Sequence, residues 1–368
     1  MEYKKIIELT TVVTGGTPST EKREYWDNGS IPWLQSGCCQ NCEVNSAGKY
    51  ITQEGYDNSS TRMMPVDTVM IALTGATAGK VGYLNFAACG NQSITGILPC
   101  GALNQRYLFY YLISQRDKIL ADCVGGAQVH ISQGYVKNIK VPVLSLVEQE
   151  QVVEVLTQLN SIISMRRKEI GLLDTLVKSR FAEMFGDPIR NPKGWKVVTI
   201  GDIVTEVRYG TSKPAVEGGK YPYLRMNNLT ADGHLDLNDL KYIDISDDEV
   251  EKCVVRKGDV LFNRTNSIDL VGKTAVFDLQ DDMVIAGYII RVRLNEKILP
   301  EVLSQYMNLE ALKDILRSMA KGAVNQANIN AQELQSIRVY VPDIELQKQF
   351  VEMKDQVDKY KFLALYLK

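Results

Sequence analysis

Histidine is scarce in this sequence of 368 residues, which contains only His130 and His234. So few imidazole groups make a Ser-His-Asp triad or a multi-histidine metal site hard to assemble. Long apolar runs are absent as well. None approaches the roughly 18 residues that a membrane helix needs, and the N-terminal residues contain no apolar signal-peptide core. We therefore expect a soluble cytoplasmic protein with no membrane segment.

The cysteines form no recognisable disulfide framework, because there are seven of them and six lie before residue 124. An odd and unevenly distributed set is typical of a reducing compartment. Cys39 and Cys42 have the spacing of a zinc-binding pair, but no second pair completes a tetrahedral site. We expect free thiols and no metal.

Neither sign of charge is in excess. The 42 Lys+Arg and 44 Asp+Glu residues give a net charge of -2, which excludes a bulk polycation. A nucleic acid would have to be bound through local patches or with charge supplied by partners. Apolar residues at 45% and charged residues at 23% are typical of a globular protein, and the length allows two or three domains.

Short motifs recur in the same order at separations of 190 to 200 residues, which indicates a tandem duplication of about half the chain. The matched motifs are Gly16-Thr17 with Gly210-Thr211, Ile31–Leu34 with Tyr221–Leu224, Asp67–Ile71 with Asp259–Asn263, Gly79-Lys80 with Gly272-Lys273, Gly126-Ala127 with Gly322-Ala323, and Val141-Pro142 with Val341-Pro342. Each half has the same predicted plan: a strand-rich segment, a short helix, a glycine-rich loop, a strand ending in Val-Pro, and a long helix.

The long helices carry a heptad pattern, from about Val147 to Phe185 and from about residue 345 to the end. A seam of this length must be buried, so we expect the two helices to pair as an antiparallel coiled coil. Arg166 would interrupt the seam and fix its register. The alternative is two amphipathic helices, each packed on its own domain. The predicted seam residues are Leu156, Leu159, Ile163, Ile170, Leu173, Phe350, Met353 and Val357.

These patterns predict an α+β fold with two pseudo-repeated β-rich domains, 1–144 and 187–342. Two long helices separate them, at 145–186 and 343–368. The second helix is shorter than the first, which weakens the expected coiled coil at its far end.

Two segments imitate phosphate-binding loops but lack essential features. Ser267–Thr274 has serine in place of the first glycine, and Gly75–Val81 is one residue short and has no Ser or Thr after its lysine. We find no glycine fingerprint for a cofactor and no carboxylate pair beside a lysine. We therefore expect no enzyme and no cofactor in this chain. A self-sufficient enzyme would instead carry a catalytic constellation in one repeat only.

Polar loops fall at matching positions in the two repeats: 35–40 and 225–230, 74–80 and 263–273, 128–133 and 325–330. Asn, Gln and Arg can read base edges, and Lys can hold phosphates. Because the frame recurs while the loop content changes, we expect the repeats to read two different short DNA sequences. For any single residue, an ordinary solvated loop remains the alternative.

Arg225 and Arg264 are expected to read bases, and Lys80 and Lys273 to hold phosphates. The full set of candidate DNA-binding residues is Gln35, Ser36, Thr74, Thr77, Lys80, Gln128, His130, Arg225, Asn227, Asn228, Arg264, Thr265, Asn266, Lys273, Asn325, Gln326 and Asn328.

Taken in order, several motifs resemble those of the specificity (S) subunit of type I restriction-modification systems, and the resemblance covers essentially the whole chain. The motifs are 191–203 (NPKGWKVVTIGDI), Gly210-Thr211, Val141-Pro142 followed by Glu148-Gln149, 178–185 (KSRFAEMF), and Asp259-Val-Leu followed by Gly272-Lys273. One departure is that the first repeat has no Gly-Trp entry and starts directly at Met1.

The resemblance implies a non-catalytic subunit that binds double-stranded DNA, with each target-recognition domain reading one half of a split site. It also implies that the helix pair sets the gap between the half-sites and docks methyltransferase (M) subunits. S-adenosylmethionine would then lie on the M subunits, and ATP and Mg would lie on restriction/motor (R) subunits. The competing interpretation is a coiled-coil protein-interaction scaffold with two β-rich domains and no DNA role.

Overall fold

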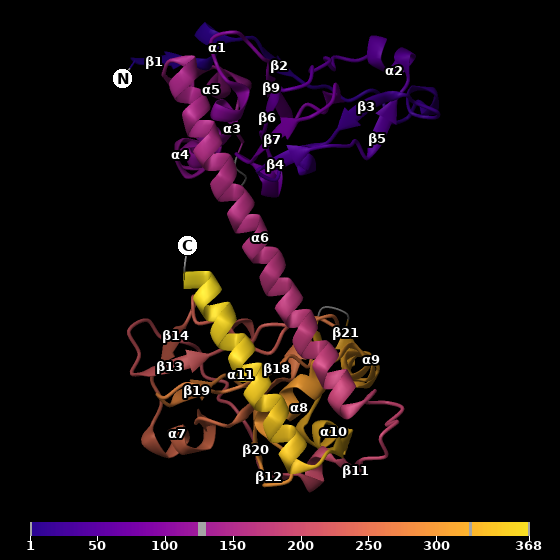
Figure 1. Cartoon of the computed structure of the whole chain (residues 1–368), viewed down its shortest axis with the longest axis vertical. Coiled ribbons are helices and arrows are strands. Elements are labelled where there is room, and N and C mark those ends of the chain that lie inside the picture. Colours follow the sequence, from indigo (N-terminus) through magenta and orange to yellow (C-terminus); the bar gives the residue numbers. More distant parts are fainter. Residues whose placement is uncertain (1, 124–129, 324–325, 367–368) are drawn as a thin grey trace. The chain divides into compact units, whose positions relative to one another are not determined.

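The computed structural model describes residues 2–123, 130–323 and 326–366. The chain divides into two compact units, Met1–Ser164 and Met165–Lys368, called unit 1 and unit 2 here. Helix α6 (Leu146–Phe185) crosses this division, so its first part belongs to unit 1 and its second part to unit 2 (Figure 1). None of the helices in the described ranges is both long and apolar enough to span a membrane.

Unit 1 has a central five-stranded sheet in the order β2-β9-β6-β7-β4, with a three-stranded sheet β5-β3-β8 and the pair β1-β10. Strands β6, β7 and β9 are buried along their whole length, and α3 packs on β6 and β7. The elements before α6 are β1 (Glu2–Lys5), α1 (Ile6–Leu9), β2 (Val12–Thr14), η1 (Arg23–Tyr25), β3 (Ile31–Leu34), η2 (Ser36–Cys38), β4 (Cys42–Val44), β5 (Lys49–Ile51), α2 (Gln53–Asp57), β6 (Val69–Ala72), η3 (Gly75–Thr77), β7 (Val81–Leu84), β8 (Cys89–Gly90), β9 (Ile94–Ile97), α3 (Gln105–Ser114), α4 (Arg116–Asp122), α5 (Gln133–Asn138) and β10 (Lys140–Val143).

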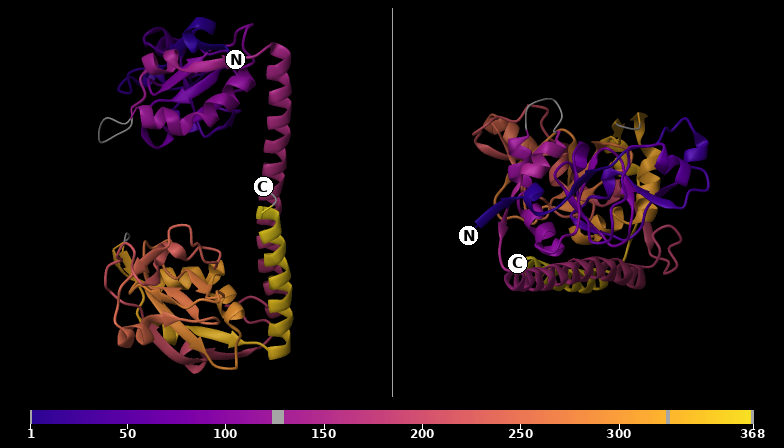
Figure 2. Two further views of the ribbon diagram at one scale, coloured as in Figure 1. Left: turned by 90° about the vertical axis from the view of Figure 1, so that its left-hand side faces the viewer. Right: turned by 90° about the horizontal axis from the view of Figure 1, so that it is seen from above.

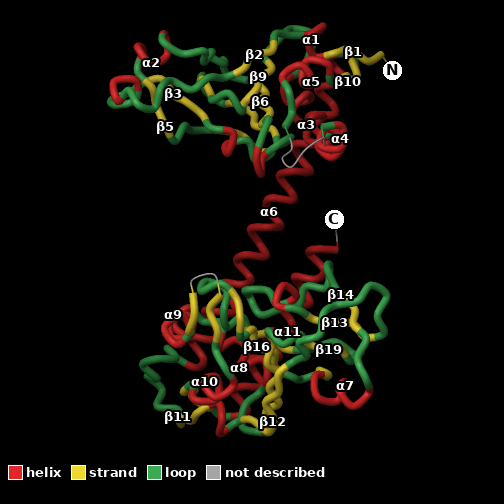
Figure 3. Tube along the Cα trace, turned by 180° about the vertical axis from the view of Figure 1, so that it is seen from behind, coloured by secondary structure: helices red, strands yellow, loops and turns green. Residues whose placement is uncertain are grey.

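Unit 2 repeats this plan with two four-stranded sheets, β12-β20-β16-β18 and β14-β13-β19-β15, a three-stranded sheet β17-β22-β21 and the pair β11-β23. Figure 3 distinguishes its helices from its strands by colour. Its elements are β11 (Lys196–Thr199), η4 (Ile200–Asp202), β12 (Val204–Tyr209), β13 (Tyr221–Leu224), η5 (Met226–Asn228), β14 (Lys241–Ile243), α7 (Asp247–Cys253), β15 (Val254–Val255), β16 (Val260–Asn263), β17 (Thr265–Asn266), β18 (Thr274–Val276), β19 (Met283–Ile285), β20 (Ile289–Leu294), α8 (Pro300–Met307), α9 (Glu310–Met319), β21 (Lys321–Ala323), β22 (Gln326–Asn328), α10 (Ala331–Ser336), β23 (Arg338–Val341) and α11 (Ile344–Tyr366).

Matched backbone hydrogen bonds confirm the tandem repeat. Ala72 N donates to Lys80 O in unit 1, and Asn263 N donates to Lys273 O in unit 2. The predicted match of Lys80 with Lys273 is therefore right. The predicted match of Asp67 with Asp259 is wrong by one residue, because Asp67 and Gly258 are the pair with positive φ, at 65° and 91°.

The first glycine match also shifts by one residue. Gly15 N donates to Ile94 O, and Gly210 N donates to Ile289 O, so Gly15 rather than Gly16 is equivalent to Gly210. Both positions require glycine, because a Cβ at either one would lie 2.1 Å from a backbone carbonyl oxygen. The match at 126–127 lies outside the described residues.

A buried glutamine joins each long helix to the short helix of its own repeat. In unit 1, Gln149 accepts a hydrogen bond from Asn104 N at 2.7 Å, and its amide donates to Leu144 O at 2.9 Å. In unit 2, Gln347 accepts from Leu299 N at 2.8 Å and donates to Pro342 O at 2.8 Å. Both glutamines are fully buried. The starting directions of α6 and α11 are thus fixed in the same way.

The predicted antiparallel pairing of the long helices is confirmed within unit 2, where α11 lies along the second part of α6 (Figure 2). Glu169, near the start of this part, accepts a hydrogen bond from Tyr360 Oη at 3.2 Å, near the end of α11. Arg166 donates to the same carboxylate at 2.8 Å. The fully buried Phe350 packs against Phe181 near the other end, with ring centroids 5.3 Å apart.

The predicted seam residues behave differently in the two parts of α6. Five of them lie in the unit 2 helix pair, where Phe350 and Val357 are buried and Leu173 and Met353 pack against the same core; the fifth, Ile170, is half-buried. In the unit 1 part, Leu159 and Ile163 are 50% and 38% exposed, and Leu156 is half-buried. The expected seam residues are therefore packed in the second part of α6, whereas in the first part they are partly or largely exposed to solvent.

Candidate nucleic-acid interface

In unit 2, three loops that are distant in the sequence are joined by backbone hydrogen bonds. Arg264 N donates to Tyr288 O, and Ile329 N donates to Arg264 O, both at 2.9 Å. The Asn263 amide also donates to Tyr288 O at 3.2 Å. The turn after β16, the turn between β19 and β20 and the end of β22 therefore form one surface. We call it the unit 2 loop face, and its residues are Tyr209, Arg264, Thr265, Asn266, Tyr288, Gln326 and Asn328.

Unit 1 has the same arrangement with different side chains. Leu73 N donates to Ser93 O, and Ile131 N donates to Leu73 O, both at 2.9 Å. Leu73 therefore occupies the position of Arg264, and Ser93 that of Tyr288. The bridge between Thr74 and His130 corresponds to the pairing of Thr265 with Asn328. The two units thus share the same backbone hydrogen-bonding pattern in these loops but carry different side chains on it.

Several predicted residues meet on the unit 2 loop face. Thr265 Oγ1 donates to Asn328 Oδ1 at 3.1 Å, and the Asn266 amide donates to Asn263 Oδ1 at 2.9 Å. Gln326 is exposed at the start of β22. Asn266 and Asn328 are half-buried, whereas Thr265 and Asn263 are buried, so the contacts place Asn266 and Asn328 at the edge of the face with Thr265 beneath them. Asn325 lies outside the described residues.

Arg264 lies on this face, and no carboxylate of the described residues pairs with it. Its guanidinium lies 5.0 Å from the centre of the Tyr209 ring, and Nη1 donates to Gly287 O at 3.4 Å. Tyr209 Oη in turn accepts a hydrogen bond from Ala331 N at 2.8 Å. The guanidinium is therefore held by a ring that is itself anchored to α10.

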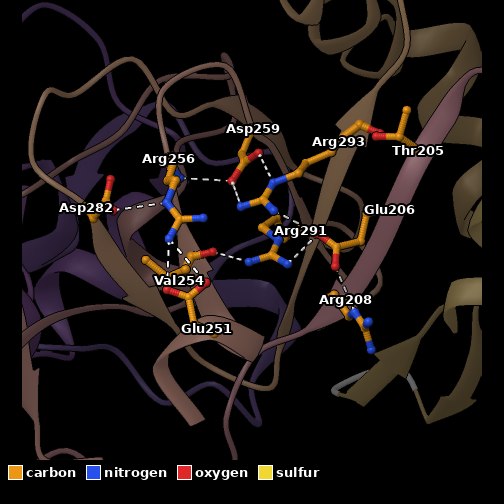
Figure 4. A network of polar contacts seen from close by, with 10 residues as sticks. All are labelled: Thr205, Glu206, Arg208, Glu251, Val254, Arg256, Asp259, Asp282, Arg291 and Arg293. Carbon is orange, nitrogen blue, oxygen red and sulfur yellow. Dashed lines mark hydrogen bonds and ion pairs between the residues drawn. The ribbon is translucent and has the colours of Figure 1, made fainter. Parts of the chain in front are cut away.

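The other half-buried or buried arginines described in unit 2 are paired with carboxylates, and three of these pairs form a network (Figure 4). Arg291, 1% exposed, donates to Glu206 at 2.7 Å, and Arg293 donates to the same carboxylate at 2.9 Å and to Asp259 at 2.9 Å. Burial, followed by the charge of Arg293, lowers the pKa of Arg291. This network belongs to the core of unit 2 and not to its loop face.

Three predicted DNA-binding residues of unit 2 have internal partners. Arg225 donates to Asp239 at 2.6 Å, and the buried Asn228 donates to Asp236 O at 2.8 Å. Lys273 is 8% exposed, and its ammonium donates to Met226 O at 2.9 Å and to Leu229 O. Burial lowers the pKa of Lys273. These contacts give all three residues a structural role in the loop after β13, whereas the neighbouring Asn227 is exposed.

The candidate residues of unit 1 are more open. Lys80 is half-buried and donates to Gln40 at 2.7 Å, so it reaches the loop after β3 as Lys273 reaches the loop after β13. Thr74 Oγ1 donates to Ser93 Oγ at 3.0 Å. Gln35 and His130 are exposed, and Ser36 and Thr77 are half-buried. Gln128 lies outside the described residues.

Sequence reasoning missed Tyr209, Tyr288 and Ser93 as parts of these faces. Tyr209 and Tyr288 are 44% and 51% exposed, and an aromatic residue directly beside a glycine, as in Tyr209-Gly210 and Gly287-Tyr288, would have been the available signal. The described residues contain no group of three or more His, Cys, Asp or Glu side chains that could hold a metal ion.

Comparison with known proteins gives a family match in each half of the chain. The family model described as the type I restriction modification DNA specificity domain matches residues 1–172 and again 192–364. The MjaIX specificity subunit of Methanocaldococcus jannaschii is 28% identical over 252 residues, which is 62% of this chain and 58% of that protein. The EcoKI specificity subunit of Escherichia coli is 24% identical over 377 residues, covering 96% of this chain and 81% of that one.

Solved structures show the same fold. The S subunit of a type I restriction-modification system from M. genitalium matches with a TM-score of 0.53 and 14% identity, over 99% of this chain and 91% of that chain. A chain from a study of type I system assembly and conformational transition matches with a TM-score of 0.57 and 17% identity, over 100% and 93%. The aligned part of this chain spans 58% of the MjaIX subunit and 45% of the EcoR124I/EcoR124II subunit of Escherichia coli.

Proposed function

Because this chain belongs to the type I restriction-modification DNA specificity family, with one family domain in each repeat, we propose that it gives such a complex its DNA sequence specificity. Each unit reads one half of a bipartite double-stranded site. The observation that carries this proposal is the pair of equivalent loop faces. Positions Leu73 and Ser93 of one repeat become Arg264 and Tyr288 in the other, on the same hydrogen-bonded frame.

In this function the chain itself is non-catalytic. Methyltransferase subunits bring S-adenosylmethionine, and restriction subunits bring ATP and Mg. A net charge of -2 fits this division, because partner subunits can supply phosphate-binding surface. Lys80, at the surface of unit 1, remains a candidate phosphate contact.

Exchange of one recognition domain tests this function. Residues 187–342 are replaced by the equivalent region of another family member, and Tyr306 and Tyr340 are kept because they donate hydrogen bonds to Pro188 O and Gly186 O. Methylation-motif mapping of the reconstituted complex should then show one half-site altered and the other unchanged.

The reciprocal exchange of 1–144 is the matched control and should alter the other half-site only. If both half-sites changed in either chimera, independent reading by two units would be excluded. If the native complex methylated without any bipartite motif, the DNA specificity role itself would fail, and the interaction-scaffold interpretation would take its place.

The continuous helix α6 supports a second part of the proposal, that this helix sets the unread spacer. Four residues inserted between Ser164 and Met165, at the division between the units, lengthen the helix by about 6 Å. Since DNA rises ~3.4 Å per base pair, the mapped spacer should grow by one or two base pairs, with both half-sites unchanged. A variant with four alanine substitutions and no insertion controls for the altered sequence. An active insertion variant with the native spacer would contradict the spacer role.

A further inference from the structure

Arg264 differs from the other buried or half-buried arginines of unit 2 in making no ion pair with any described residue. The other buried or half-buried arginines described in unit 2 make ion pairs, such as Arg225 with Asp239 and Arg293 with Asp259. Arg264 is half-buried, yet its guanidinium contacts only a carbonyl oxygen at 3.4 Å and the face of a tyrosine ring among the described residues. Its buried Nε, like those of Arg225 and Arg291, has no hydrogen-bond partner within the described residues.

A partly buried guanidinium of this kind is costly unless an acceptor arrives to satisfy it. The side chain is also held in one orientation. Tyr209 stacks against it at 5.0 Å, and Tyr209 is fixed by the hydrogen bond from Ala331 N. A guanidinium whose plane is fixed in advance loses little entropy when it binds a planar pair of acceptors.

The repeat shows which kind of acceptor fits. A phosphate contact is independent of sequence and would be useful in both units, but the position of Arg264 is occupied in unit 1 by Leu73, which is 4% exposed. A residue that reads a base is expected to differ between two units that recognise different sequences. Guanine presents O6 and N7 as adjacent acceptors in the major groove, which match the two outer nitrogens of arginine.

We propose that Arg264 reads a guanine in the half-site bound by unit 2, and that Tyr209 is the positioning residue that orients its guanidinium. This inference rests on the proposed DNA specificity function and names one base class within it. Tyr288 belongs to the same face, and the hydrogen bond from Arg264 N to Tyr288 O holds the two residues next to each other.

The test is competition binding of the reconstituted complex to duplexes in which each base pair of the unit 2 half-site is replaced in turn. Arg264→Gln should lose discrimination at one G·C pair by roughly 5- to 150-fold and keep it at every other position. Arg264→Lys keeps the charge but not the planar fork, so it should lose the same discrimination while retaining non-specific affinity.

The positioning role of Tyr209 is tested separately. Tyr209→Phe keeps the ring and should retain most of the discrimination, whereas Tyr209→Leu should reduce it at the same base pair as Arg264→Gln. Arg338→Gln, at an exposed arginine of β23, is the matched control and should leave the binding pattern unchanged.

Two results would overturn the inference while the DNA specificity function stands. The first is a loss of affinity in Arg264→Gln that is equal for all duplexes and reduces the salt slope by about one charge, as a phosphate contact would. The second is an unchanged discrimination pattern in Arg264→Gln. A wild-type complex that distinguishes no base pair in this half-site would instead contradict the proposed function itself.

Discussion

Replacement of Phe350 by alanine should lower the free energy of unfolding of unit 2 by about 4 kcal/mol. Phe350 is fully buried, and its ring meets those of Phe181 and Phe185 edge-on, with centroids 5.3 and 5.5 Å away. Its removal would leave a cavity where the end of α6 and the start of α11 join the core of unit 2, and edge-to-face aromatic contacts would be lost as well.

Hydrogen exchange followed by mass spectrometry in increasing urea measures this loss for each unit separately. The amides of unit 2 should become less protected, while those of the central sheet of unit 1 should be unaffected. Leu172→Ala on α6 is the control, because Leu172 is 61% exposed, and it should change stability by less than about 0.5 kcal/mol. A loss below about 1 kcal/mol in Phe350→Ala would show that the helix junction does not stabilise unit 2.

Glu206→Gln should destabilise unit 2 by about 3 kcal/mol, the lower end of the cost of leaving a buried charge unpaired. Burial opposes ionisation of Glu206, but the hydrogen bond from Arg208 and the charges of Arg291 and Arg293 outweigh it and lower the pKa of this carboxyl group. We use the lower end of this free-energy cost because the Glu206 side chain is 30% exposed, so water partly solvates the site. The glutamine amide oxygen could still accept a hydrogen bond, but the guanidinium of Arg291 would stay inside the core without its counter-charge, with Val254 O as its other acceptor.

Arg291→Met should cost far less, within about 1 kcal/mol of the native protein, because an apolar side chain of similar length replaces the buried charge and Glu206 keeps Arg293 and Arg208. The double variant should therefore be more stable than Glu206→Gln alone. Chemical unfolding of the native protein and the three variants measures this order. If Arg291→Met proved as destabilising as Glu206→Gln, the stability that Arg291 contributes would come from packing of its aliphatic stem and not from its charge.

Much of the architecture followed from local features of the sequence. The heptad spacing placed α6 and α11, because apolar side chains every three or four residues lie on one face of a helix. The order of motifs gave the tandem repeat, since close backbone approach and positive φ favour glycine at fixed points such as Gly210 and Gly272. The family resemblance rests on the same motifs, and the two family matches confirm it.

The sequence was a weaker guide to the register of the repeat, that is, to which residue of one repeat is equivalent to which residue of the other. A single residue inserted in a loop moves a glycine match by one position, and only hydrogen-bond partners reveal which glycine is equivalent. Gly15 and Gly16 are indistinguishable in the sequence, but only Gly15 bonds to Ile94 O as Gly210 bonds to Ile289 O.

The sequence by itself determined that this chain consists of two related domains with long amphipathic helices and no excess of charge, because periodicity, turns and composition are properties of neighbouring residues. The tertiary structure decided which polar side chains face outward. Lys273 is held by carbonyl groups more than 40 residues away along the chain, whereas Arg264 lies on the ring of Tyr209, a residue of another strand. A polar side chain is satisfied by whatever the fold brings beside it, and that partner is set by strand pairing between distant segments.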